Sequence, residues 1–329
     1  MNQLSVCKPT FHQLMPPMIT ARPDVWQAIL QFFVAEIRNP NTRRAYLHGA
    51  GVFFAFVGSS TGIDRIELIN SLHVASWIES MQARGLSAPT IKLRLAGLRM
   101  LFEALVRQQF LTVNPASVVR GPKHSVSKGK TPVLGGDETK QLLNSIDTTC
   151  LIGLRDRAII GTMAYSFARI GAVTSLKVEH VFRQKRRLWL RLSEKGGKTH
   201  DIPCHHHLES YIAEWLEEAG LGDQPRAPLF QTFSVQGTRS GGTRSLSGRP
   251  MTQSVAWEML QRRAKAAGID TAICNHTFRA TGITAYLSNG GTIERAAIIA
   301  GHASTRTTQL YDRRPDDVTL DEIEKINFG

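Results

Sequence analysis

The chain has 329 residues, a length that suits two ordinary domains with a sizeable core. Its 40 Lys and Arg outnumber its 27 Asp and Glu, which gives a formal net charge of +13 and a pI near 10.0. This excess indicates a polyanionic partner, either nucleic acid or an anionic membrane. A membrane is the weaker alternative, because the sequence has no long uncharged apolar run and its basic residues are spread over both halves.

The cysteines and the first residues bear on the cellular compartment. Cys7, Cys150, Cys204 and Cys274 are far apart and form no Cys-x-x-Cys pair, so we expect reduced thiols. The first eighteen residues lack a basic start followed by an apolar stretch, so we expect no secretory signal. Both features predict a cytoplasmic protein.

The N-terminal third of the chain is predicted to be helical. Residues 1–22 are rich in proline and form a predicted tail, whereas residues 23–112 carry apolar side chains at helical spacing and show no competing strand pattern. Asp24 is a predicted N-cap, Gly58 a predicted helix stop and Ser87 a predicted N-cap. We expect a small all-helical domain here.

A basic linker and a second domain are predicted to follow. Residues 113–133 combine prolines and glycines with five basic or histidine side chains between Arg120 and Lys130. The domain over 134–329 is predicted to be mostly helical, with one hairpin in which Gly196 and Gly197 make the turn. The Gly-, Ser- and Arg-rich residues 235–250 are predicted to form a mobile loop whose arginines, Arg239, Arg244 and Arg249, reach phosphates.

Five polar side chains in the second domain suggest phosphodiester chemistry. His276 and Arg279 are three residues apart and share one face of a helix. His302 and Tyr311 follow near the C-terminus, and Arg169 stands at a predicted helix start, which favours an anion. Two guanidiniums can clamp the non-bridging oxygens of a phosphodiester. Imidazoles can form hydrogen bonds with the same oxygens or transfer protons, and a tyrosine hydroxyl can attack the phosphorus.

This order, Arg…Lys…His-x-x-Arg…Gly-His…Tyr, resembles the tyrosine recombinase family, also called phage-type integrases. The separations from His276 through Arg279 and His302 to Tyr311 are 3, 23 and 9 residues, and all three are similar to those of the family. Residues 41–57 and 87–116 resemble the family's core-DNA-binding helices. The resemblance covers nearly the whole chain after the first twenty or so residues.

The resemblance implies a mainly α fold, with an N-terminal all-helical core-DNA-binding bundle and a C-terminal mixed α/β catalytic domain holding a small antiparallel sheet. It implies that Arg169 and Arg279 clamp the phosphate, that Tyr311 forms a 3′-phosphotyrosyl bond, and that His276 and His302 serve as acid/base and phosphate-contacting groups. The general acid would be Lys195, with Lys198 as the alternative. No cofactor and no metal are expected, because two arginines replace the charge stabilisation of a metal ion.

The resemblance also implies partners. These are double-stranded DNA at a recombination core site, a homotetramer on two such sites that exchanges strands through a Holliday junction, and accessory DNA-bending or directionality proteins. We expect a mobile element in a bacterium as the setting, with the protein on the nucleoid. An apolar stripe of Val318, Leu320, Ile323 and Ile326 is predicted to dock on a neighbouring subunit, or else on its own domain. The predicted DNA contacts are Thr42, Arg43, Arg44, Lys92, Arg94, Arg99 and Lys198.

Two departures from the family pattern leave alternatives open. Ala172 occupies the position where family members usually carry an acidic residue, and Phe167-Ala168 replaces the usual Thr-Gly before the first arginine. The alternatives are a type IB topoisomerase-like relaxing enzyme and a catalytically weak DNA-binding protein of the same fold. The run Cys204 to His207 suggests a metal cluster, but consecutive residues do not converge easily on one ion, so we expect packing or surface histidines.

Overall fold

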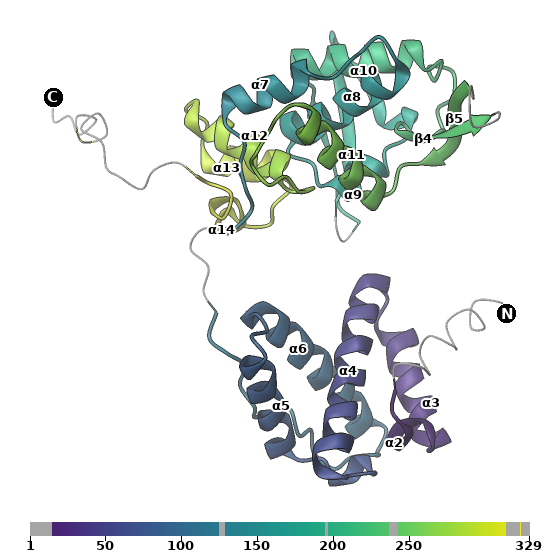
Figure 1. Ribbon diagram of the computed structural model, residues 1–329, viewed down its shortest axis with the longest axis vertical. Coiled ribbons are helices and arrows are strands. Elements are labelled where there is room, and N and C mark those ends of the chain that lie inside the picture. Colours follow the sequence, from purple (N-terminus) through teal and green to yellow (C-terminus); the bar gives the residue numbers. More distant parts are fainter. Residues whose placement is uncertain (1–14, 125–128, 195–196, 237–242, 314–322, 324–329) are drawn as a thin grey trace. The chain divides into compact units, whose positions relative to one another are not determined.

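The structure is a computed structural model that describes residues 15–124, 129–194, 197–236, 243–313 and 323 (Figure 1). The chain divides into two compact units, Met1–Ser125 and Val126–Gly329. The division falls within residues 113–133. Part of that segment is packed: Asn114 donates from Nδ2 to the carbonyl of Arg99 in unit 1, whereas Gly129 donates its N–H to the carbonyl of Leu310 in unit 2.

The regular elements in the described part of unit 1 are all helices or helical turns. Its aromatic core is centred on Phe53, whose ring lies edge-to-face 5.1 Å from Trp77 and 5.8 Å from Phe102. The elements are α2 (Pro17–Thr20), α3 (Pro23–Gln31), the π-helical turn η1 (Phe32–Glu36), α4 (Pro40–Thr61), the 3₁₀ turn η2 (Ile66–Leu68), α5 (Ser71–Ala83) and α6 (Ala88–Arg107).

Two helix ends in unit 1 differ from the prediction. The N-cap of α3 is Arg22, not Asp24, because Pro23 occupies the first helical position; Asp24 lies in the first turn and pairs with Arg22. Helix α4 continues past Gly58 and ends at Gly62, whose φ of 68° gives the left-handed cap. Gly58 has φ in the ordinary range and is accommodated within the helix.

Helices α4 and α6 pack closely through glycine. A Cβ atom on Gly97 of α6 would lie 2.6 Å from the Tyr46 ring of α4. A Cβ on Gly49 of α4 would lie 3.2 Å from Cγ of Arg94 on α6. The two helices therefore approach each other closely at two points where one of them has only a glycine. This contact fixes the angle at which the helices cross.

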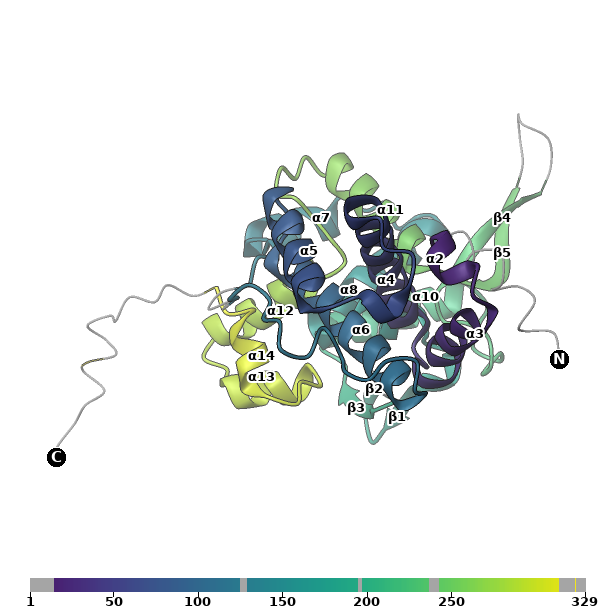
Figure 2. The same cartoon turned by 90° about the horizontal axis from the view of Figure 1, so that it is seen from below.

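Unit 2 surrounds a central helix with shorter helices and two small antiparallel sheets (Figures 1 and 2). Helix α8 (Leu151–Ser166) is buried over most of its length and packs against α10 and α12. The other helical elements are α7 (Gly136–Asn144), α9 (Ile170–Thr174), the 3₁₀ turn η3 (Val178–His180), α10 (His206–Glu218), α11 (Gln253–Ala266), α12 (Thr277–Ser288), α13 (Ile293–Ile299) and α14 (Thr305–Gln309).

The first sheet has the order β1-β2-β3, formed by β1 (Val181–Gln184), β2 (Arg187–Ser193) and β3 (Thr199–Pro203). In β2, Leu188, Leu190 and Leu192 are buried, as alternation on a half-buried strand requires. The hairpin of β2 and β3 confirms the predicted strands. Gly197 in its turn has a φ of 77°. The sequence did not reveal β1.

The second sheet corrects one prediction. Residues 235–250 were predicted to form a mobile loop, but β4 (Gln231–Gln236) and β5 (Thr243–Pro250) pair as an antiparallel hairpin. Its hydroxyls bond across the strands, Thr232 to Ser247 at 2.7 Å, and Phe233 packs against the core. This hairpin lies at the opposite end of unit 2 from α13 and α14 (Figures 1 and 2). Arg239 lies outside the described residues, and Arg244 and Arg249 are exposed.

Candidate active site

Arg169 is placed by a break between two helices. Helix α8 ends at Ser166, and Phe167 takes a left-handed φ of 54° that redirects the chain. Arg169 is then the N-cap of α9, so its side chain stands at a helix start, as predicted. The side chain keeps 32% of its area exposed, and its guanidinium pairs with Glu194. One face of this cation is therefore accessible from outside.

Arg279 lies in the first turn of α12 and is fully buried. Its guanidinium donates to the carbonyl of Phe167 and, at 2.5 Å, to that of Ala300. These two carbonyls lie just past the ends of α8 and α13, so the arginine ties together segments far apart in the sequence. Burial, followed by the charge of Arg169, lowers the pKa of Arg279 to about 10, and this arginine remains a cation at neutral pH.

His302 is positioned by the C-terminus of α13. Gly301 has a φ of 61°, and the His302 N–H donates to the carbonyl of Ala297 at 2.9 Å, a Schellman arrangement. The imidazole Nε2 lies 2.6 Å from Nη2 of Arg279, and Nδ1 lies 2.8 Å from Oγ1 of Thr308. Since an arginine can only donate, these partners assign Nε2 as the acceptor and Nδ1 as the protonated nitrogen.

The imidazole of His302 is held in its neutral form. Burial, and then the charges of Arg279 and Arg169, lower the pKa of His302 to about 3. At neutral pH the ring is therefore unprotonated, and its Nε2 can accept the hydrogen bond from Arg279.

Tyr311 follows α14, and its side chain lies against Arg279 and His302. Its ring is 5.7 Å from the His302 ring at an interplanar angle of 14°, and Cζ of Arg279 is 5.8 Å from its centroid. The Tyr311 carbonyl accepts from Oγ1 of Thr284 at 2.8 Å, which ties the segment to α12. The structure thus brings the tyrosine next to the buried arginine and a neutral imidazole.

His276 is the N-cap of α12, three residues before Arg279. Partial burial, and then the charges of Arg279 and Arg169, lower its pKa. It shares the electrostatic environment of the two arginines, and part of its side chain is exposed at the surface.

Glu194 is the site residue that sequence reasoning missed. It follows β2, and its side chain is 4% exposed. Oε2 contacts Nη1 of Arg169, and Oε1 lies 3.8 Å from Nη1 of Arg279. A signal for it was present in the sequence, because an acidic residue directly precedes the predicted catalytic lysine in a chain whose usual acidic position is Ala172.

The two candidate lysines follow Glu194 closely in the sequence. Lys195 lies outside the residues that the structure describes. Lys198 is exposed, and its carbonyl accepts the N–H of Glu194 at 2.7 Å. Both lysines are therefore close in the chain to a carboxylate that contacts the arginine pair.

The predicted DNA contacts of unit 1 fall into two groups. Arg43 donates to the carbonyl of Ile37 at 2.9 Å, and Arg99 donates to the carbonyls of Ala116, at 3.0 Å, and Val119. The remaining four lie on α4 and α6: Arg44 and Lys92 are exposed, while Thr42 and Arg94 are half-buried.

The histidines after Cys204 have structural contacts. His205 caps α10 by accepting the N–H of His207 at 3.3 Å, and its ring stacks on Tyr165 at 4.5 Å. Within the described residues, no three His, Cys, Asp or Glu side chains are grouped as metal ligands. The helices of that part of the chain also include none that is long and apolar enough to cross a membrane.

The chain matches the models of two known protein families. The model of the phage integrase family matches residues 132–317, and that of the phage integrase N-terminal SAM-like domain matches residues 31–109. The chain is 26% identical over 289 residues to tyrosine recombinase XerD of Listeria monocytogenes serotype 4b (strain F2365), which covers 88% of this chain and 93% of that protein.

Two solved structures are similar in fold. One is the XerH site-specific recombinase in a post-cleavage complex with a palindromic difH substrate, with a TM-score of 0.68, 20% identity, and coverage of 89% of this chain and 81% of that one. The other is a lambda integrase tetramer bound to a Holliday junction, with a TM-score of 0.63, 17% identity, and coverage of 90% and 80%. The family match spans more than half of the chain, from residue 132 to residue 317. The chain therefore belongs to the phage integrase family, and it is a tyrosine-type site-specific DNA recombinase.

Proposed function

We propose that Tyr311 is the nucleophile of this recombinase and that Arg169 and Arg279 neutralise the scissile phosphate. The observation that carries the proposal is the packing of Tyr311 against both Arg279 and the neutral His302. The phenolic oxygen attacks phosphorus, the bond from phosphorus to the 5′ oxygen breaks, and the protein becomes joined to the DNA 3′ phosphate. The ester retains the energy of the broken phosphodiester, so the strand can be rejoined without a nucleotide cofactor.

Two proton transfers complete this step. The proton of the Tyr311 hydroxyl passes to His276, whose imidazole is neutral at pH 7 because burial and then the charges of Arg279 and Arg169 lower its pKa. His302 instead accepts a hydrogen bond from Arg279 through Nε2. Lys195 gives a proton to the departing 5′ oxygen. The 5′ hydroxyl of a partner strand then attacks the phosphotyrosine, and a second round resolves the Holliday junction.

A nicked suicide substrate tests the nucleophile. Cleavage next to the nick releases a short fragment that cannot return, so a catalytic protein accumulates as a covalent adduct. The unaltered protein is expected to form this adduct, and Tyr311→Phe, which lacks only the hydroxyl, is expected to bind DNA without forming it. A binding-only protein would give no adduct in either case. Supercoil relaxation by a monomer, without exchange between two sites, would favour the topoisomerase-like alternative.

A sulfur-substituted substrate tests the general acid. When sulfur replaces the bridging 5′ oxygen, the leaving thiolate needs no proton, because a thiol is far more acidic than an alcohol. Lys195→Ala is expected to cleave the ordinary substrate poorly and the sulfur-containing one at nearly the unaltered rate. If Lys198→Ala shows this rescue instead, the roles of the two lysines are reversed.

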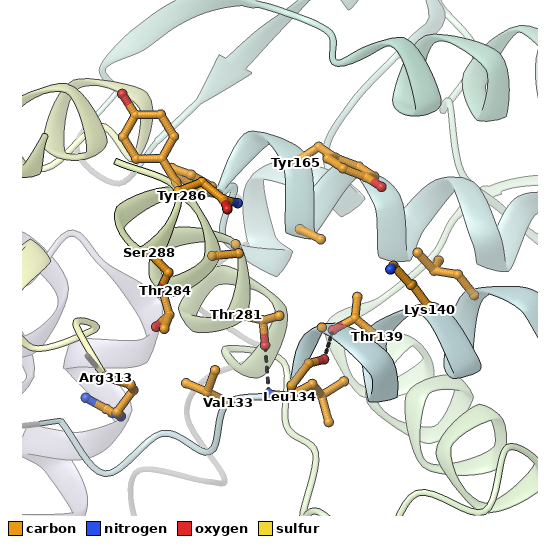
Figure 3. Close-up of a pocket in the computed structure, with 18 of the residues that line it drawn as sticks. Val133, Leu134, Thr139, Lys140, Tyr165, Thr281, Thr284, Tyr286, Ser288 and Arg313 are labelled. Atoms are coloured by element: carbon orange, nitrogen blue, oxygen red, sulfur yellow. Dashed lines mark hydrogen bonds between the residues drawn. The ribbon is translucent and has the colours of Figure 1, made fainter. Parts of the chain in front are cut away.

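We also propose that the protein acts as a tetramer on two core sites, held together by exchange of the segment after Arg313. A cavity of about 1030 Å³ supports this idea (Figure 3). Apolar parts of α7, α8 and α12 line it, and so does Arg313, at the end of the continuously described chain. The occupant we propose is the tail of a neighbouring subunit, with Val318, Leu320, Ile323 and Ile326 as its apolar stripe; of these only Ile323 lies within the described residues.

Disulfide trapping distinguishes exchange between subunits from docking on the same subunit. In a background with Cys150→Ser, one protein carries Ser288→Cys in the cavity and a second carries Ile323→Cys. Mixed on core-site DNA and oxidised, they are expected to form a disulfide between chains. A disulfide that forms only when one chain carries both cysteines would show docking in cis. Junction assembly that survives deletion of residues 316–329 would also contradict the exchange.

The setting we propose is a mobile element acting on DNA in the bacterial cytoplasm. Sequencing the DNA joined to Tyr311 in cells would identify the core site and the element that carries it.

A further inference from the structure

The carboxylate of Glu194 lies between the two arginines of the proposed site. Oε2 contacts Nη1 of Arg169, and Oε1 lies 3.8 Å from Nη1 of Arg279. The side chain is only 4% exposed, and a buried carboxylate is costly unless cations and donors surround it. We propose that Glu194 is a positioning residue that holds both guanidiniums in place at the site of the scissile phosphate and replaces the acidic group that is absent at Ala172. This inference rests on the proposed function of Arg169 and Arg279.

The backbone holds Glu194 firmly at the end of β2. Its N–H donates to the carbonyl of Lys198 at 2.7 Å, and its carbonyl accepts the N–H of Gly197 at 3.2 Å. The preceding residues Leu192 and Ser193 pair with His200 and Thr199 on β3. The carboxylate is thus fixed to the hairpin of β2 and β3, one residue before Lys195 in the sequence, and it links this hairpin to the arginines.

The loop that carries His302 encloses the same carboxylate. A Cβ atom on Gly301 would lie 3.2 Å from Cγ of Glu194 and 3.2 Å from Cε1 of His200. His200 in turn has Nε2 3.2 Å from the carbonyl of Ile299. Glu194 therefore packs against the chain immediately before His302, so one residue contacts the segments that carry three of the proposed catalytic groups.

The surroundings of Ala172 agree with the proposal that Glu194 replaces the acidic group absent from this position. Ala172 is 5% exposed on α9, and its N–H donates to the carbonyl of Arg169 at 2.8 Å. A methyl group there supplies no charge to the neighbouring arginine. Glu194 supplies one from a different element, β2, and reaches Arg169 from there.

The geometry indicates that the carboxylate of Glu194 supports the arginines and does not block the phosphate site. The side chain of Arg169 keeps 32% of its area exposed while that of Glu194 keeps 4%, so the carboxylate lies on the interior side of the guanidinium. A guanidinium has five N–H donors, and the contact with Glu194 leaves others for the oxygens of a phosphate. A negative charge between the two cations also reduces their mutual repulsion, which helps to keep both charged and in place.

The experiment compares single-turnover cleavage of two suicide substrates, one with the ordinary scissile phosphodiester and one with a methylphosphonate in its place. The methylphosphonate has one negative charge fewer, so its cleavage depends less on well-aimed cations. The test variant is Glu194→Gln, which has nearly the same shape and no charge. The matched control is Glu214→Gln, because Glu214 also pairs with an arginine of unit 2, Arg157, outside the proposed site.

We expect Glu194→Gln to cleave the phosphodiester about 10²-fold more slowly than the unaltered protein, the size typical for removal of one preorganised electrostatic interaction. On the methylphosphonate the deficit is expected to shrink to less than about 10-fold. Glu214→Gln is expected to match the unaltered protein on both substrates. If Glu194→Gln does not fold, Glu194→Asp, which withdraws the charge by one methylene group, is expected to show the same selective relief on the methylphosphonate.

Three outcomes would overturn the inference. An unchanged rate would deny any role for Glu194, a faster rate would show that its carboxylate blocks the phosphate site, and an equal deficit on both substrates would show a general structural effect. A failure of the proposed function is recognised separately, because the unaltered protein itself would then form no adduct with the phosphodiester.

Discussion

Arg279 and His302 share a hydrogen bond of 2.6 Å between Nη2 and Nε2, although 23 residues separate them in the chain. The bond requires a neutral imidazole, since a protonated ring would place two donors face to face. Each of the two residues thus determines the state of the other: the cation keeps the ring unprotonated, and the ring accepts one of the donors of the buried guanidinium.

Arg279→Lys is expected to impair both folding and cleavage. A lysine cannot reach the carbonyls of Phe167 and Ala300 together, so the free energy of unfolding should fall by about 2–4 kcal/mol and cleavage of the suicide substrate by about 10²-fold or more. Urea unfolding and adduct formation measure the two effects.

The control for this substitution is Arg155→Lys. Arg155 is also buried, and it also donates to a backbone carbonyl, that of Gln231, at 2.9 Å, but it lies outside the proposed site. It should lose a similar amount of stability and retain cleavage at a temperature where it is folded. Similar cleavage by the two variants would contradict the role of Arg279.

Acidification is expected to destabilise the protein through His302. Its folded pKa of about 3 is lower than the ordinary value of 6.5, so the unfolded chain takes up a proton first as the pH falls. The contribution of His302 to the free energy of unfolding is complete above pH 6.5, and it is lost progressively as the pH falls from there toward 3. Between pH 6.5 and 5.5 the loss from this one group should be about 1 kcal/mol.

The measurement is the urea unfolding free energy at both pH values for the unaltered protein and for His302→Asn. His276 also has a lowered pKa and contributes with the same sign, so only the difference between the two proteins reports on His302. An identical pH dependence in the variant would show that His302 is not held neutral by folding.

Gly301→Ala is expected to reduce both stability and cleavage. The position has a φ of 61°, and a Cβ there would meet Glu194 and His200 at 3.2 Å. The left-handed backbone alone costs about 1–2 kcal/mol for alanine, and the steric conflict should displace Glu194 and the His302 loop as well.

Gly290→Ala separates the two causes. Gly290 also has a left-handed φ, 84°, but a Cβ there would meet nothing within 4 Å. It should show the backbone cost in thermal unfolding and leave adduct formation unchanged. A Gly301→Ala variant that cleaves as fast as Gly290→Ala would argue against the importance of the packing between Glu194 and Gly301.

Lys92→Ala and Arg44→Ala are expected to weaken DNA binding through charge alone. Both side chains are exposed on unit 1, and removing one phosphate-binding cation should reduce the slope of log affinity against log salt by about 1. Arg99→Ala should instead lower the stability by about 1–3 kcal/mol, because the carbonyls of Ala116 and Val119 lose their donor. Salt titrations of binding with a core-site duplex, together with thermal unfolding, distinguish the two effects. An unchanged slope for Lys92→Ala would remove Lys92 from the DNA interface.

Local signals in the sequence were sufficient for much of the architecture. Helical spacing of apolar residues predicted the helices of unit 1, because this pattern records which face of a helix is buried. A pair of glycines predicted the turn of the hairpin formed by β2 and β3. The N-cap predicted at Ser87 is confirmed as the N-cap of α6. The hairpin of β4 and β5 was missed because its Gly- and Ser-rich composition is typical of loops, and cross-strand pairing, which the local composition does not record, decides its structure.

By itself, the sequence determined the family and the order of the proposed catalytic residues, because the separations among His276, Arg279, His302 and Tyr311 are fixed along the chain. Only the tertiary structure decided which groups surround them. The burial of Arg279, the neutral state of His302 and the entry of Glu194 between two arginines depend on contacts among α8, β2, α12 and α13. Electrostatic interactions depend on distance and solvent exposure, which no one-dimensional pattern contains.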